Sequence, residues 1–117
     1  MDKSPRIVVV GCCASGKSTL VKNLRKADIP AFSVAQEHSS VSYMFRLRDP
    51  DFVVFLDASY EELRRRRDIS WGKDRLQDQK RRLAKAKHVA DIHINTDQMT
   101  PGQVSDLVLK LLEENES

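Results

Sequence analysis

The stretch RIVVVGCCASGKS, residues 6–18, decides the fold of this chain. Residues 7–10 form a nearly continuous run of β-branched side chains, which is typical of a strand buried on both faces of a parallel sheet. Residues 17–27 carry apolar side chains at helical spacing. Between the two segments, residues 11–18 match the pattern G-x-x-x-x-G-K-[ST]. The sequence therefore predicts a strand, a glycine-rich loop and a helix in direct succession.

Each residue type in this loop suits the binding of a phosphate chain. Gly11 and Gly16 allow backbone conformations and a close approach that a side chain would prevent. The amides that follow converge on phosphate oxygens at the positive end of the helix. Lys17 supplies a mobile charge for the β- and γ-phosphates, Ser18 offers its hydroxyl to Mg²⁺, and Thr19 is placed for the α-phosphate. The nucleotide-binding residues predicted from the loop are Gly11, Cys12, Cys13, Ala14, Ser15, Gly16, Lys17, Ser18 and Thr19.

The expected ligand of this loop is ATP with Mg²⁺. GTP is disfavoured because the chain contains no Asn-Lys-x-Asp motif for guanine. The alternative is a glycine-rich turn that only caps the helix. A cap, however, does not require Lys17 and Ser18 together.

The rest of the chain alternates between short apolar runs and amphipathic stretches. Further strands are predicted over residues 30–35, 52–56 and 91–94. Helices are predicted over residues 17–27 and 39–48, from the capping box at Ser59 and Glu62, after Gly72, and from Pro101 to Leu112. This alternation indicates an α/β fold, with a mostly parallel sheet of about four strands and helices on both faces. Residues 1–117 are expected to form one domain, with residues 113–117 as a frayed tail.

Three segments resemble the P-loop small-molecule kinases, the group that includes adenylate, shikimate, adenylylsulfate and dephospho-coenzyme A kinases. The segments are the loop, residues 55–63 (FLDASYEEL) and residues 90–97 (ADIHINTD). The resemblance implies a minimal P-loop NTPase fold in an unusually short member of the group. It also implies that Arg66 opens a mobile lid, and that the adenine is held by Asn95, Thr96 and Asp97.

Two acidic residues are candidates for the chemistry, because phosphoryl transfer needs a carboxylate near the metal or the attacking oxygen. Asp57 directly follows one predicted strand and Glu37 closely follows another, and open α/β sheets bind ligands at the carboxyl ends of their strands. We expect Asp57 to hold Mg²⁺ together with Ser18, and Glu37 to act on the acceptor. Residues 52–57 form either the Walker B strand or the next strand of the sheet. With the arginines of the lid, the predicted catalytic residues are Lys17, Glu37, Asp57, Arg66 and Arg75.

Positive charge is concentrated in residues 64–88. This segment holds eleven Lys and Arg against three Asp, a net charge of +8, whereas the rest of the chain carries −5. We favour a lid at residues 71–88 that folds over the triphosphate, because guanidinium groups stabilise charge on a transferring phosphoryl group. The alternatives are a solvated helical face and a nucleic-acid surface. The nucleic-acid surface is the less favoured of the three, because Trp71 is the only aromatic residue of the segment.

Composition disfavours several other classes of protein. No apolar run is long enough to cross a bilayer, and residues 1–5 do not resemble a signal peptide. Cys12 and Cys13 are adjacent, so they cannot form a disulfide framework, and we expect a location in the cytoplasm. We interpret both as small filler residues, with a thiol of lowered pKa near a helix N-terminus as the alternative. No metal-ligand spacing connects them with the three histidines, which are His38, His88 and His93.

Together these features predict a protein that binds ATP and Mg²⁺ and acts as a phosphotransferase on an unidentified small acceptor, or as a weak NTPase. Two alternatives come from other classes. One is a non-catalytic nucleotide-binding regulatory module, and the other is an RNA-binding protein that uses residues 64–88. Turnover with an acceptor separates the first from its rivals, and salt-dependent RNA binding identifies the last.

Overall fold

The computed structural model describes residues 5–12, 15–39, 44–66 and 72–116. Its four strands run parallel and lie in the order β2-β1-β3-β4. The chain therefore has an α/β fold with a four-stranded parallel sheet, as predicted. In chain order the elements are β1 (Ile7–Gly11), α1 (Lys17–Lys26), β2 (Ala31–Ser33), the short 3-10 helices η1 (Gln36–His38) and η2 (Met44–Arg48), β3 (Phe52–Asp57), α2 (Tyr60–Arg66), α3 (Lys73–Val89), β4 (Ile92–Asn95) and α4 (Pro101–Glu116).

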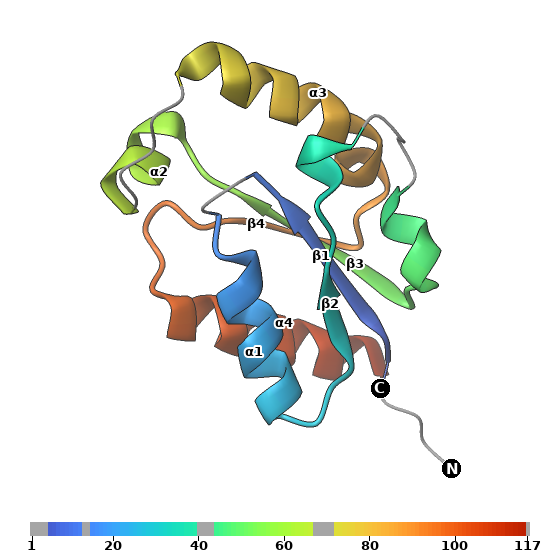
Figure 1. Ribbon diagram of the computed structural model, residues 1–117. Coiled ribbons are helices and arrows are strands. Elements are labelled where there is room, and N and C mark those ends of the chain that lie inside the picture. The colour runs from blue at the N-terminus through green and yellow to red at the C-terminus, as the bar shows by residue number, and fades with distance from the viewer. Residues whose placement is uncertain (1–4, 13–14, 40–43, 67–71, 117) are drawn as a thin grey trace.

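Helices cover both faces of the sheet, with α1 and α4 on one side and α2 and α3 on the other (Figure 1). Successive residues of a strand point to opposite faces. In β1, Ile7 and Val9 accordingly pack with α1 and α4, whereas Val8 and Val10 pack with α2 and α3. All four side chains have 0% exposure. Burial on both faces explains why the strand is an unbroken apolar run.

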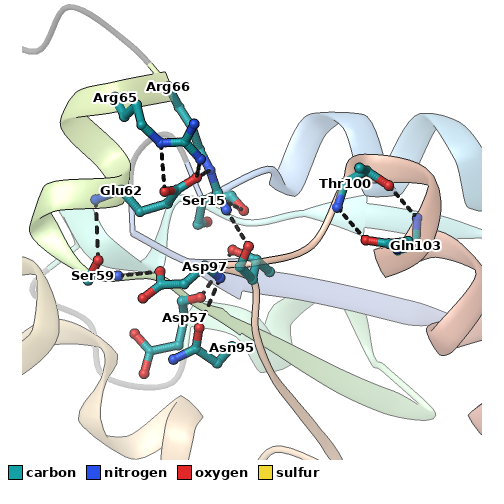
Figure 2. Close-up of polar contacts among 11 residues, drawn as sticks. Ser15, Asp57, Ser59, Glu62, Arg65, Arg66, Asn95, Asp97, Thr100 and Gln103 are labelled. Carbon is teal, nitrogen blue, oxygen red and sulfur yellow. Dashed lines mark hydrogen bonds and ion pairs between the residues drawn. The ribbon is translucent and has the colours of Figure 1, made fainter.

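Two helices begin at the caps that the sequence predicts. The Ser59 hydroxyl accepts a hydrogen bond of 3.2 Å from the Glu62 amide at the start of α2. Before α4, the Gln103 side chain accepts a bond from the Thr100 amide at 2.9 Å. The Thr100 hydroxyl in turn accepts one from the Gln103 amide at 3.1 Å (Figure 2). Each cap satisfies amides that would otherwise have no partner in the first helical turn.

The structure differs from the predicted boundaries in three places. The described part of the predicted helix 39–48 contains only η2, which ends before Asp49, a residue with φ +51°. Residues 40–43 of that prediction lie outside the described residues. The strand predicted over residues 30–35 is limited to β2, because the chain turns into η1 directly afterwards. Helix α4 continues to Glu116, so the tail predicted to fray from residue 113 is helical up to that point.

Helix α3 carries the second part of the basic segment. Its buried side chains recur at helical spacing, and the apolar ones pack against the sheet face formed by β1 and β3. They are Leu76, Gln79, Leu83 and Ala86. The described part of the predicted lid is thus a layer of the fold in this structure. None of the described helices is long and apolar enough to cross a membrane.

Candidate functional site

The backbone of the glycine-rich loop depends on both of its glycines. Gly11 ends β1 and pairs with Leu56 of β3. A Cβ atom on Gly11 would lie 2.5 Å from the Leu56 carbonyl oxygen and 2.7 Å from Ser15 Oγ, so only glycine fits there. Gly16 precedes α1 with φ +104°, a conformation that side chains disfavour. The predicted site residues Cys13 and Ala14 lie outside the described residues.

A cavity of about 610 Å³ lies at the N-terminus of α1. Helix geometry leaves the first amides of α1 without partners inside the helix, and these amides face toward its N-terminal end. The predicted residues that line the cavity are Ser15, Gly16, Lys17, Ser18, Thr19, Glu37, Arg66 and Thr96. Glu62 and Met99 also line it, and neither was predicted from the sequence. The structure therefore brings the loop together with residues of η1, α2 and the segment after β4.

Lys17 and Glu37 form an ion pair inside this cavity. The Lys17 ammonium group also donates to the carbonyl oxygens of Gly11 at 2.7 Å and Cys12 at 3.2 Å. The side chains of Lys17 and Glu37 are 12% and 4% exposed. Of the two predicted acids, Glu37 is therefore the one that lines the cavity.

Arg66 connects α2 with the loop and with the segment after β4 (Figure 2). Its guanidinium group donates to Glu62 Oε1 at 3.1 Å, to the Ser15 carbonyl at 3.5 Å and to the Thr96 carbonyl. Glu62 also accepts two hydrogen bonds from Arg65, at 2.7 and 3.0 Å. Hydrogen bonding to Arg65 has the largest effect on the pKa of Glu62 and holds it below its ordinary value, and the bond from Arg66 lowers it further. Glu62 thus stays ionised and orients Arg66 toward the cavity.

The three residues predicted to hold adenine have different positions. Thr96 is 2% exposed and lines the cavity, and its amide donates to the Asp57 carbonyl at 2.8 Å. The Asn95 side-chain oxygen accepts from the Asp97 amide at 2.9 Å, and Asp97 Oδ1 accepts from the Ser59 amide at 2.8 Å (Figure 2). The side-chain oxygens of Asn95 and Asp97 therefore shape the loop, and of the three residues Thr96 lines the cavity.

Asp57, which was predicted to hold Mg²⁺ together with Ser18, is not among the residues that line this cavity. Leu56 packs with α1 and α4 and lines the first cavity, so the next residue of the strand points to the other face. There Asp57 Oδ2 lies 3.7 Å from His93 Nε2 and 3.9 Å from Lys87 Nζ. Alternation along β3 therefore turns this carboxylate away from the cavity in this structure, toward the face of the sheet on which Cys12 packs.

Arg75 is also apart from the loop. It is exposed on the first turn of α3 and is not among the residues that line the cavity. Among the described residues, no group of three or more His, Cys, Asp or Glu could hold a metal ion.

Cys12 is a buried thiol with 1% exposure. Burial, followed by the nearby Asp57 carboxylate, raises the pKa of Cys12 to about 11. The hypothesis of a lowered thiol pKa is therefore wrong for Cys12, which packs with Val10 and Phe55 as a small apolar residue.

Comparison of the sequence with models of known protein families gives no match, and neither does comparison with curated proteins. Assignment of a function to this site therefore depends on the residues and geometry of the chain itself.

Proposed function

We propose that this protein binds ATP and Mg²⁺ through a P-loop and transfers the γ-phosphoryl group to a small acceptor, with weak hydrolysis when no acceptor is bound. One observation carries the proposal: Lys17, Ser18, Glu37 and Arg66 line a single cavity at the N-terminus of α1. Lysine, a hydroxyl, a carboxylate and a guanidinium are the groups that phosphoryl transfer uses.

Each of these groups has a role in the proposed reaction. Helix amides and Lys17 bind the phosphate oxygens, and Ser18 binds Mg²⁺. The acceptor oxygen forms a bond to the γ-phosphorus while the bond from phosphorus to the β–γ bridging oxygen breaks, and ADP leaves with that electron pair. Arg66 stabilises charge on the transferring group. The acceptor's proton passes to Glu37, because Glu62 is held by two arginines.

The ion pair between Lys17 and Glu37 fits this sequence of events. A triphosphate attracts Lys17 more strongly than a single carboxylate does, because it carries more negative charge. Binding of ATP would therefore move Lys17 from Glu37 toward the phosphates. The Glu37 carboxylate then loses its contact with Lys17 and accepts the acceptor's proton.

Binding of ATP, measured by calorimetry with Mg²⁺ and with a chelator, tests the proposal. Ser18→Ala should weaken binding in the presence of Mg²⁺ by about tenfold and change binding in the chelator much less, because its hydroxyl acts through the metal. Lys85→Ala is the control, since Lys85 is exposed on α3 and lines no part of this cavity. Absence of ATP binding by the unmodified protein would overturn the proposal.

A non-catalytic nucleotide-binding module is the second candidate. The observation that favours it is the position of Asp57, which leaves Glu37 as the one predicted acid that lines the cavity. A coupled assay that measures the release of ADP from ATP separates the two candidates. It is run with and without a panel of small hydroxyl compounds. ATP binding without any ADP release identifies the module.

A further inference from the structure

A second groove lies beside the loop, between α1 and β2, which are neighbours in Figure 1. Its volume is about 570 Å³, and Ser18 lines both this groove and the nucleotide cavity. The other polar and aromatic residues that line the groove are Lys22, Arg25, Lys26, Phe32 and Ser33. We call this surface the α1–β2 groove.

The charged side chains that line the α1–β2 groove are all positive. Lys22, Arg25 and Lys26 line it, and no Asp or Glu is among its lining residues. The spacings of three and four residues place these cations on one face of α1, where like charges repel each other. An anion in the groove would relieve that repulsion and bind several cations at once.

Arg25 has two contacts that hold its side chain against β2. Its Nε–H donates to the Ala31 carbonyl at 2.8 Å, and its Cζ lies 5.4 Å from the centre of the Phe32 ring. The Ala31 bond uses one of the five N–H donors of a guanidinium group. A side chain held in this way loses little conformational entropy when it binds an anion.

A purely structural role explains only part of this cluster. Arg25 and Lys26 lie in the last turn of α1, where cations stabilise the helix dipole. Lys22 lies outside that turn, and Arg25 is bonded to β2 instead of to the final carbonyls of its own helix. The groove also continues to Ser18 at the opposite end of α1.

We propose that the α1–β2 groove binds an oxyanion, a phosphate or a carboxylate, and that this oxyanion is part of the phosphoryl acceptor. The role of the groove as an acceptor site rests on the proposed function, whereas anion binding itself does not. Because the groove meets the nucleotide cavity at Ser18, an acceptor anchored among the cations would extend its hydroxyl group toward the γ-phosphate. The acceptor is then a small anionic alcohol and not a neutral one.

The test is a titration of the protein loaded with ADP and Mg²⁺. Inorganic phosphate is added in one experiment and acetate in another, and the chemical shifts of the backbone amides are measured by NMR at each step. We expect saturable shifts at Lys22, Lys26, Phe32 and Ser33, and the anion that binds more tightly identifies the acceptor class. The double variant Lys22→Ala/Lys26→Ala should bind that anion about tenfold more weakly, because it lacks two side chains that donate charge-assisted hydrogen bonds. Lys85→Ala/Lys110→Ala removes the same charge from exposed sites outside the groove and should leave the affinity unchanged.

Absence of shifts at the groove amides, or equal weakening in both double variants, would overturn the inference. Failure of the proposed function has a different signature. If ADP does not bind, the titration is run on the protein alone. Shifts at the groove amides without shifts at the loop amides of Ser15 and Gly16 then show that the anion binds in the groove and not at the loop. Anion binding in the groove would then stand, and its role as an acceptor site would fall.

Discussion

The ammonium group of Lys17 and the carboxylate of Glu37 form an ion pair at the N-terminus of α1, although the two residues lie 20 positions apart in the chain. Both side chains are largely removed from water, so the two charges stabilise each other strongly. A ligand phosphate that binds Lys17 must therefore compete with Glu37. The free protein and the ATP complex are expected to differ at this contact.

Loss of one partner of this pair should destabilise the protein. Lys17→Ala removes the ammonium group beside the buried Glu37 carboxylate and should lower the free energy of unfolding by about 3 kcal/mol. Adding Glu37→Gln to this variant removes the carboxylate charge as well, so the double variant should recover most of that loss. Urea unfolding measures both, with exposed Lys85→Ala as the control. A double variant as unstable as Lys17→Ala would show that the pair is not the cause.

The close approach of β1 and β3 at Gly11 should make substitution of this residue destabilising. Gly11→Ala forces a methyl group against the Leu56 carbonyl and Ser15 Oγ, and should cost about 2 kcal/mol of stability. Gly102→Ala is the matched control in α4, where the added methyl group meets only Thr100 Oγ1 at 3.9 Å. That variant should be neutral or more stable by up to about 1 kcal/mol, because alanine favours a helix. Thermal unfolding of the two variants provides the comparison, and equal melting temperatures would contradict it.

Arg65 and Arg66 form a matched pair for the proposed role in transfer. Both donate to Glu62, but of the two only Arg66 donates to the carbonyls of Ser15 and Thr96. Arg66→Ala should lower kcat by about a hundredfold, with a smaller change in ATP affinity, because its charge acts mainly in the transition state. Arg65→Ala should change kcat by less than about twofold. Equal losses in the two variants would assign the effect to Glu62 and not to Arg66.

The two acids predicted from the sequence should behave differently. Glu37→Gln is expected to lower transfer by about a hundredfold while ATP still binds, because the proton acceptor is lost. Asp57→Asn should leave both ATP affinity and turnover within about twofold, because its carboxylate lies on the other face of the sheet near His93 and Lys87. Steady-state kinetics with calorimetry measures both parameters. A strong effect of Asp57→Asn on Mg²⁺-dependent turnover would instead support the role of Asp57 that was predicted from the sequence.

The raised pKa of Cys12 has consequences for reactivity and for stability. In a Cys13→Ser background, Cys12 should resist alkylation at pH 8 in the folded protein and react once the protein is unfolded, because the reactive species is the thiolate. The folded pKa of about 11 lies above the ordinary thiol pKa of 9.0. The unfolded chain therefore loses its thiol proton first as the pH rises, and stability should fall between pH 9 and 11 by up to about 2 kcal/mol. Cys12→Ala in the same background should lack this component of the fall.

The amino-acid sequence by itself determined the α/β class and the positions of most elements. The β-branched run at residues 7–10, the glycines of the loop and the caps at Ser59 and Thr100 are local signals, and each depends on residues within a few positions of one another. Such signals predict where a strand ends and a helix begins. They also predicted that Lys17 and Ser18 lie at the start of α1, because the loop and the helix are continuous in the chain.

The tertiary structure decided which distant side chains meet. Asp57 is the last residue of β3 and Glu37 closely follows β2, and no local pattern distinguishes the two acids. Alternation along β3 turns Asp57 toward α3, whereas η1 brings Glu37 back to Lys17. Tertiary packing also places α3 as a layer over the sheet. It likewise brings Arg66 to the carbonyls of Ser15 and Thr96. The ion pair and hydrogen bonds named here join residues 20 to 51 positions apart. They arise from strand order and helix packing, which short-range sequence signals do not encode.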